Sequence, residues 1–267
     1  MQIGSLQGQH PDSDFFVYAA ADAHYFDQHA RPLINSVIKN TLHSIHIHLN
    51  NPRPDQIELC QTTPRLSATW EYTNKDQFQS AINFWSDPKL ANPYLARRNR
   101  MLGIKVVDKT LSFDDNLLIW LQKTYYACVR FIRLAQIIKS GQSFLAIDVD
   151  GIVRKSLDFS PHSNHDFYLY LKEKGGHLAG VLLGTGGVGS HAFVQELSHN
   201  INAEIARDNI YWFLDQDCLD SIVHKYNKGY LPMTYIDWHM QDHSAIWSAK
   251  GKRKELQVFK LEQDKYR

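Results

Sequence analysis

The amino-acid sequence predicts an α/β protein with a mostly parallel central sheet, and its 267 residues are enough for one large domain or two small ones. The first observation is an alternation of strand-like apolar runs with helical patterns, and strands joined through helices pair in parallel. The second is a short apolar run at 143–147, typical of a strand buried on both faces. The alternating elements are strand 15–20, helix 28–41, strand 44–49, helix 54–61 and strand 66–72.

Bulk composition excludes several classes of function. The net charge is +1, so no global field attracts the chain to nucleic acid or to an anionic membrane. The three cysteines (Cys60, Cys128, Cys218) form neither a disulfide framework nor a zinc pattern and favour a reducing compartment. The first residues lack the apolar core of a signal peptide, and no apolar run approaches the length of a membrane span. We therefore expect a cytoplasmic protein without a nucleic-acid partner or a membrane span.

The first strand is expected to end in a ligand-binding loop, after a loose leader over residues 1–13. The loop is Ala21-Asp22-Ala23-His24-Tyr25, which follows Ala20. Small residues let a ligand approach the backbone, Asp22 offers an acceptor, and Tyr25 offers a stacking face. The alternative is that Asp22 only caps the following helix.

The next strand carries His46 and His48 on one face. Two histidines at that spacing are candidate metal ligands, but covering one side of a sheet is the simpler interpretation. The stretch 75–115 has no recognisable pattern. Its Arg97, Arg98 and Arg100 could hold a phosphate or an acidic acceptor, or form a solvated basic face.

Residues 116–139 have the apolar periodicity of one long helix, with Arg130 and Arg133 inside it. An arginine near the apolar face of a helix needs an anionic partner, because unpaired burial is costly. The pair Asp148 and Asp150, or a bound phosphate, could supply that partner.

The acidic pair Asp148-Val149-Asp150, a DxD motif, directly follows the buried strand. If strand geometry continues, both carboxylates face one spot about 6–7 Å apart. Their mutual repulsion favours a bound dication, and oxygen-only ligands suit Mn²⁺ or Mg²⁺. Parallel sheets bind ligands at the carboxyl ends of their strands. The alternative is a turn with two solvated acids.

The remaining elements are less regular. We expect a strand at 177–183, a helix at 190–207, a helix at 219–226 and a strand near 230–237. The glycine run 184–189 lacks the GKS/GKT ending of a P-loop and lies too late in the chain for a dinucleotide fingerprint. Asp215 and Asp217 either cap the helix that follows them or flank Gln216 beside a sugar.

The tail combines a glycine with four cations, Lys250, Lys252, Arg253 and Lys254 around Gly251, which suits a diphosphate. Basic tails are usually solvated, but the neighbouring Ile246 and Trp247 indicate a docked segment.

The order of these motifs resembles the retaining, metal-dependent glycosyltransferases of the GT-A fold. The group contains the bacterial lipopolysaccharide galactosyltransferases and glycogenin and is known as glycosyltransferase family 8. The resemblance runs from residue 15 to residue 254 and is most specific at FLAIDVDGIVRKSL. It implies a single Rossmann-like α/β/α domain over residues 1–267, with a donor-nucleotide half at about 14–150 and an acceptor and sugar half at about 151–267.

The resemblance also implies roles for individual residues. Asp148 and Asp150 would hold Mn²⁺ or Mg²⁺, and Asp215, Gln216 and Asp217 would lie at the donor sugar. The family pattern has asparagine at the position of Leu178 and a metal-binding histidine at the position of Ser248. His243 or His239 could replace that metal ligand, or the extra cations Lys250 and Arg253 could take over the charge. The implied donor-binding residues are Ala20, Asp22, His24, Tyr25, Arg130, Asp148, Val149, Ala179, Gly180, Lys250, Gly251 and Lys254.

The expected activity is transfer of a hexose, glucose or galactose, from a UDP-sugar to a hydroxyl acceptor on a glycan, a lipid-linked sugar or a protein, with retention of configuration. Two alternatives remain at this point. One is a nucleotidyltransferase, although AAADAHY lacks the Gly and Lys or Arg that such a loop usually carries. The other is a non-catalytic nucleotide-sugar-binding protein on the same fold.

Overall fold

The computed structural model describes residues 1–91, 110–159, 164–171, 176–232, 234–249 and 251–267. The expected Arg97, Arg98, Arg100 and Lys250 therefore lie outside the described residues. The strands are β1 (Gln7–Gly8), β2 (Phe15–Asp22), β3 (Ser44–Asn50), β4 (Leu66–Glu71), β5 (Ser143–Ile147), β6 (Gly151–Val153), β7 (Phe167–Leu171), β8 (His177–Gly184), β9 (Lys228–Tyr230), β10 (Ile236–Asp237) and β11 (Ile246–Ser248).

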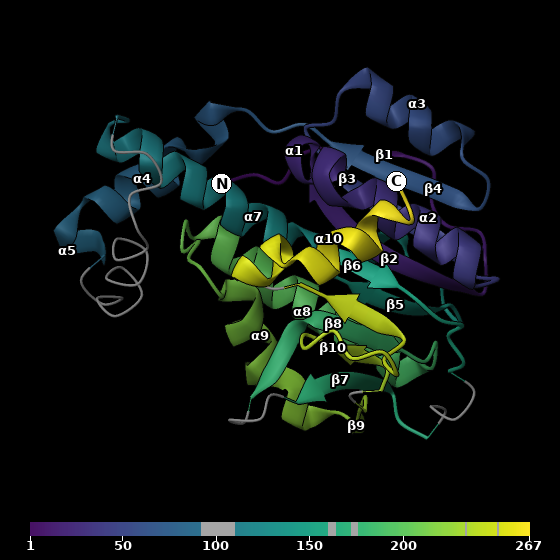
Figure 1. The fold of residues 1–267 in the computed structure, drawn as a ribbon. Coiled ribbons are helices and arrows are strands. Elements are labelled where there is room, and N and C mark those ends of the chain that lie inside the picture. Colours follow the sequence, from purple (N-terminus) through teal and green to yellow (C-terminus); the bar gives the residue numbers. More distant parts are fainter. Residues whose placement is uncertain (92–109, 160–163, 172–175, 233, 250) are drawn as a thin grey trace.

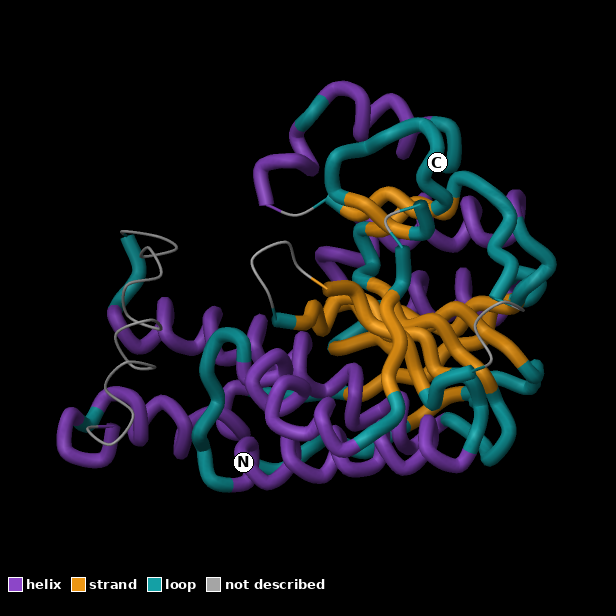
Figure 2. The backbone as a smooth tube through the Cα atoms, turned by 90° about the horizontal axis from the view of Figure 1, so that it is seen from below, coloured by secondary structure: helices purple, strands orange, loops and turns teal. Residues whose placement is uncertain are grey.

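The helices cover both faces of the sheet (Figures 1 and 2). They are α1 (Ala23–Tyr25), α2 (Arg31–Asn40), α3 (Pro54–Thr62), α4 (Gln79–Ser86), α5 (Pro88–Ala91), α7 (Phe113–Ile137), α8 (Val188–Ala206), α9 (Leu214–Ile222) and α10 (Gln257–Asp264). A π-helical segment (Phe26–Ala30) precedes α2, and 3₁₀ turns lie at Lys75–Phe78, Val223–Lys225 and Gly251–Glu255. No helix within the described ranges is long and apolar enough to cross a bilayer.

The main sheet has eight strands in the order β1-β4-β3-β2-β5-β8-β7-β9. Strands β4, β3, β2 and β5 are parallel neighbours, as the alternation of elements predicted. Strand β8 pairs antiparallel with both β5 and β7, so the sheet is mixed. It contains strands from both predicted halves of the chain. The α/β class and the mostly parallel centre are therefore confirmed.

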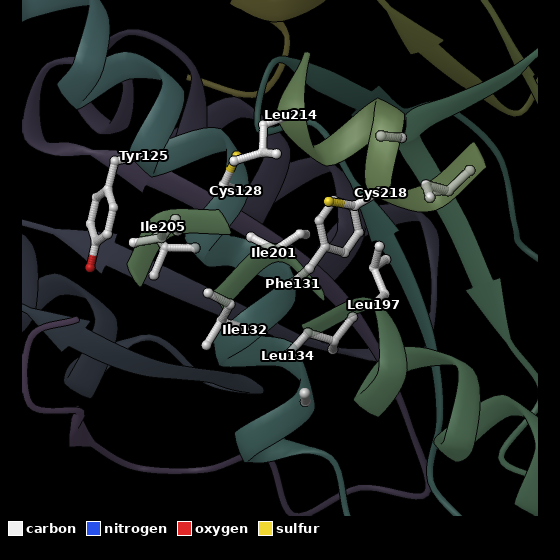
Figure 3. Packing of buried hydrophobic residues seen from close by; sticks show 14 of the residues in the cluster. Tyr125, Cys128, Phe131, Ile132, Leu134, Leu197, Ile201, Ile205, Leu214 and Cys218 are labelled. Atoms are coloured by element: carbon white, nitrogen blue, oxygen red, sulfur yellow. The ribbon is translucent and has the colours of Figure 1, made fainter. Parts of the chain in front are cut away.

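Successive residues of β2 serve two cores, because neighbouring side chains on a strand point to opposite faces. Phe16 and Tyr18 face one side with α7, α8 and α9, whereas Val17 and Ala19 face the other side with α2. Strands β2 and β5 are consequently apolar over most of their length. Figure 3 shows the first core, where residues of α7, including Cys128 and Phe131, meet α8 and α9.

His46 and His48 are fully buried beneath α7, which confirms the interpretation that they cover the sheet. The two ring nitrogens of His46 lie 2.8 Å from Ser67 Oγ and 3.0 Å from Thr69 Oγ1. Arg133 forms its buried ion pair with Glu71 of β4, a partner that the sequence patterns did not indicate.

Several sequence-based element predictions were wrong. The expected loose leader contains β1, where a Cβ on Gly8 would lie 2.4 Å from the Ala68 carbonyl oxygen, so only glycine lets this edge strand approach. The strand expected at 230–237 is two short strands, β9 and β10, in different sheets. The expected continuation of strand geometry through Asp150 is a turn, closed by a hydrogen bond from Gly151 N–H to the Asp148 carbonyl (2.9 Å).

Candidate functional site

A cavity of about 540 Å³ opens where β2 and β5 end side by side. The register pairs Tyr18 of β2 with Ala146 of β5, so Ala20 and Asp148 leave the same edge of the sheet together. This is the edge at which parallel sheets bind ligands. The lining residues come from five segments: Ala20, Ala21, Asp22, Tyr25; Trp120, Lys123, Tyr126, Ala127, Arg130; Asp148, Val149, Asp150; Trp212; Ser248, Ala249, Gly251, Lys254.

One end of the cavity is formed by Asp22 and Tyr25. The Oδ1 atom of Asp22 accepts a hydrogen bond from Tyr25 N–H (2.7 Å), so Asp22 is a helix cap and also lines the cavity. The two interpretations of Asp22 are compatible. The cap holds the Tyr25 ring against the cavity, where Lys254 Nζ lies 4.7 Å from the ring centroid. His24 is not a lining residue; its Nε2 pairs instead with Gln28 (2.9 Å).

Arg130 links three elements at the centre of the site. Its guanidinium donates to Asp148 Oδ1 (2.5 Å), to the Ala179 carbonyl (3.0 Å) and to Asp215 Oδ2 (3.0 Å). Burial lowers the pKa of Arg130, but the carboxylates of Asp148 and Asp215 outweigh it and raise the pKa above the usual value. The expected anionic partner of Arg130 is thus present within the chain, and Asp148 supplies it together with Asp215.

The acidic pair lies in the turn after β5, with Asp148 more exposed to the cavity than Asp150. Burial raises the pKa of Asp150 to about 6, the negative charge of Asp148 adds to this, and Lys254 opposes it. Lys254 Nζ lies 2.5 Å from Asp150 Oδ2. The other oxygen, Asp150 Oδ1, is buried without a hydrogen-bond partner in the part of the chain that the structure describes.

Gly180 of β8 makes room for the acidic pair. A Cβ at this position would lie 2.5 Å from Asp148 Oδ2, closer than a real side-chain carbon can approach. The same residue binds the turn, because its carbonyl accepts a hydrogen bond from Asp148 N–H (3.1 Å). Gly180 therefore fixes where the Asp148 carboxylate lies, although Gly180 itself does not line the cavity.

Asp215, Gln216 and Asp217 lie in the first turn of α9, not before the helix as predicted. Gln216 Oε1 accepts a hydrogen bond from Ala179 N–H (3.0 Å), and its amide nitrogen lies 3.3 Å from Asp220 Oδ2. Asp217 accepts a hydrogen bond from the Tyr211 hydroxyl (2.9 Å). None of the three lines the cavity, and Asp215 meets it only through Arg130.

Similarity to known proteins was found through structure and not through sequence. No protein-family model matches the chain, and no curated protein matches it in sequence. The chain matches a solved galactosyltransferase, LgtC, described in complex with donor and acceptor sugar analogues, at a TM-score of 0.51 and 10% identity. The match covers 94% of this chain and 96% of that one. This chain has the fold of that galactosyltransferase.

Two further solved structures match at lower TM-scores and add no argument. One is mouse xyloside xylosyltransferase 1, at a TM-score of 0.46 and 10% identity over 90% of this chain and 98% of that one. The other is the glycosyltransferase GlyE of Streptococcus pneumoniae, at 0.49 and 13% identity over 93% of this chain and 63% of that one. The fold that the motif resemblance implied is confirmed through LgtC, and the activity is a separate question.

On this galactosyltransferase fold, the residues of the acidic turn fit a divalent cation. Asp150 offers an unpartnered buried oxygen, and the Asp148 side chain is 42% exposed, so each has an oxygen to donate. Mn²⁺ and Mg²⁺ are commonly held by one or two carboxylates together with substrate phosphates and water. Of the described residues, no three His, Cys, Asp or Glu gather as a closed site. His239 and His243 are exposed, do not line the cavity and are not brought to the pair.

Apart from Arg130, the sequence interpretation missed the lining residues of α7, and it also missed Trp212. Trp120, Lys123, Ala127 and Arg130 are three or four residues apart, so they share one helix face. Once Arg130 was singled out, this spacing was a signal that could have identified its neighbours. No comparable signal marks Trp212, since its place depends on the packing of α9 against α7.

Proposed function

We propose that this chain is a metal-dependent glycosyltransferase that transfers a hexose from a UDP-sugar to a hydroxyl acceptor with retention of configuration. The observation that carries the proposal is one cavity that combines a stacking ring (Tyr25), a paired carboxylate site (Asp148, Asp150) and a nearby cation (Lys254). The Tyr25 ring can stack on a nucleobase. The carboxylate pair can hold a divalent cation together with a diphosphate, and Lys254 can stabilise the negative charge that develops on the departing diphosphate.

In the proposed reaction, the bond between the sugar C1 and the diphosphate oxygen breaks, and a bond from the acceptor oxygen to C1 forms. A bound Mn²⁺ or Mg²⁺ would neutralise charge on the leaving diphosphate. Lys254 would leave Asp150 to pair with a phosphate oxygen, and Arg130 would keep Asp148 oriented. The acceptor proton would pass to the leaving phosphate oxygen, which balances the step.

Two routes give retention: a covalent intermediate or attack from the face that the diphosphate leaves. The first needs a nucleophile beneath C1. Gln216 is a weak nucleophile whose amide is already bound by Ala179 and Asp220, and Asp217 is bound by Tyr211. The second route, which needs no protein nucleophile, is therefore favoured.

The first test is the melting temperature of the purified chain with UDP, GDP, CDP or ADP, each in Mn²⁺ or in EDTA. A ligand at about 100 times its dissociation constant stabilises the folded state by about 2.7 kcal/mol. For a chain of this size that raises the melting temperature by roughly 5 °C or more. The expected result is such a rise with UDP and Mn²⁺ only. No rise with any nucleotide would contradict the donor site, and a rise with ADP or CDP alone would support nucleotidyl transfer. Hydrolysis of the UDP-sugar in Mn²⁺ then separates an enzyme from a non-catalytic nucleotide-sugar-binding protein.

Replacing Gly180 with alanine is expected to weaken UDP binding in Mn²⁺ by about tenfold, because the new methyl group displaces the Asp148 carboxylate. Isothermal titration calorimetry measures the change. The matched control is Gly187→Ala, where the nearest atom to a new Cβ is 4.0 Å away and the affinity should not change. Equal affinities for both variants and the wild type would show that the position of Asp148 does not matter.

A further inference from the structure

The cavity continues along α7 past the groups assigned to the donor. Arg130, Ala127, Lys123 and Trp120 lie on one face of the helix. At a rise of 1.5 Å per residue, Lys123 and Trp120 lie about 10 Å and about 15 Å from Arg130 along the helix axis. This outer end of the cavity has no role in the proposed donor site.

Two indole rings form a corner at this outer end. Trp120 of α7 and Trp212, which precedes α9, lie with ring centroids 5.5 Å apart and planes at 85°. Both are partly exposed and both line the cavity. Indole faces carry a partial negative charge and attract the positively polarised C–H groups on the apolar face of a sugar ring. Both rings pack partly against the first core, and the surface that they leave to the cavity suits the apolar face of a saccharide.

Lys123 adds a positive charge to this corner. Its ammonium lies 5.4 Å from the centroid of the Trp120 ring, and the side chain is exposed. Lys254, which also lines the cavity, has Asp150 as its partner. Lys123 has no carboxylate partner among the described ion pairs, so its charge is available to an anionic ligand.

The corner also lies close to the proposed transfer centre. Trp212 is three residues before Asp215, whose carboxylate is bound by Arg130. Tyr25 and Lys254 lie close to each other and come from other elements, α1 and the 3₁₀ turn at Gly251–Glu255. A molecule stacked in the corner would thus contact other lining residues than those assigned to the nucleobase and the diphosphate, as an acceptor must.

We propose that Trp120, Trp212 and Lys123 form the acceptor subsite and that it takes a saccharide bearing an anionic group, a carboxylate or a phosphate. The inference rests on the proposed glycosyl transfer and names its acceptor class. The tryptophans bind the sugar ring, and Lys123 selects the charged acceptor over a neutral one.

The test is ¹⁹F NMR of the full chain labelled with 5-fluorotryptophan, without nucleotide. The Trp120 and Trp212 signals are assigned with the variants Trp120→Phe and Trp212→Phe. Three matched probes are titrated: methyl β-glucuronide, methyl β-glucoside 6-phosphate and neutral methyl β-glucoside. The first two distinguish a carboxylate from a phosphate. We expect an anionic probe to shift these two signals alone, with an affinity about threefold above that of the neutral probe, as for an exposed ion pair.

In Lys123→Gln, the preference for the anionic probe should disappear while the neutral probe still binds. Lys139→Gln is the matched control, since this exposed lysine pairs with Asp12 outside the cavity and should leave the preference intact. No shift of either signal with any probe would overturn the subsite. Equal binding of charged and neutral probes to the wild type would overturn the selection by Lys123.

The result of the ¹⁹F NMR titration is independent of the melting-temperature test of the proposed function, because the titration contains no nucleotide and no metal. A melting-temperature response to UDP with Mn²⁺, but no shift at Trp120 and Trp212, would reject the acceptor subsite and keep the glycosyltransferase. Shifts at both tryptophans with no response to UDP would keep a saccharide site and reject the transfer reaction.

Discussion

Replacing Asp150 with asparagine is expected to abolish Mn²⁺-dependent hexose transfer from a UDP-sugar while leaving the chain folded. Asparagine keeps the size of the side chain but removes the charge that attracts a cation, and loss of such a group lowers turnover by at least about 100-fold. The same variant should lose the Mn²⁺-dependent part of the rise in melting temperature with UDP. Near-normal transfer would exclude Asp150 as a metal ligand.

The stability of this variant follows from the pKa of Asp150. Burial raises that pKa to about 6 in the folded chain from 3.8, so ionising the carboxyl costs folding free energy, and the cost grows as pH rises from 3.8 to about 6. At neutral pH the cost is fully present, and asparagine removes it. The attraction of Lys254 is already included in that pKa, but the substitution leaves the partly buried Lys254 without its carboxylate partner, which opposes the gain. We therefore expect a melting temperature close to that of the wild type at pH 7.

A control variant distinguishes a specific effect at Asp150 from the general effect of removing one carboxylate charge. Asp12→Asn removes an exposed charge that pairs with Lys139 far from the acidic turn in sequence, and its carboxylate is 90% exposed. Transfer and UDP binding should be unchanged in this variant. If Asp12→Asn lowered transfer as much as Asp150→Asn, a change in net charge would explain both.

Replacing Arg130 with methionine is expected to destabilise the fold by about 3 kcal/mol, because it leaves buried carboxylates without their cation. The cost of losing the cation is larger for Asp215 than for Asp148. The Asp215 side chain is only 11% exposed, whereas that of Asp148 is 42% exposed and can be hydrated. Burial already raises the pKa of Asp215, with Arg130 opposing the rise. Without Arg130 the pKa rises further. Urea unfolding measures the loss.

The pH dependence gives this prediction a definite sign. A carboxyl with a raised folded-state pKa costs stability above its unfolded pKa, so the deficit of Arg130→Met should be larger at pH 7 than at pH 4. The double variant Arg130→Met/Asp215→Asn should recover part of the loss at pH 7, since the two residues are in contact. Arg207→Met, which removes an exposed pair with Glu204, should change stability little. A deficit independent of pH would point to lost packing instead.

The sequence determined most of the fold by itself. The periodicities located β2, α2, β3, α3, β4, α7, β5 and α8 within a few residues, because each element is either apolar throughout or amphipathic over its whole length. The short strands β1, β6 and β9 were not predicted, or were placed in a longer strand. Two or three residues hold too little pattern to predict pairing, and their partners lie far away in sequence.

The sequence also located the acidic turn, the loop with Asp22 and Tyr25, and Arg130, all of which meet in one cavity. Each follows a strand or lies in a helix whose position the local pattern indicates. Only the tertiary structure decided how these residues are paired: Arg130 with Asp215, Asp150 with Lys254, and Gly180 against Asp148. It also brought Trp120 to Trp212. Such contacts join residues up to 104 positions apart through packing, which local periodicity does not encode.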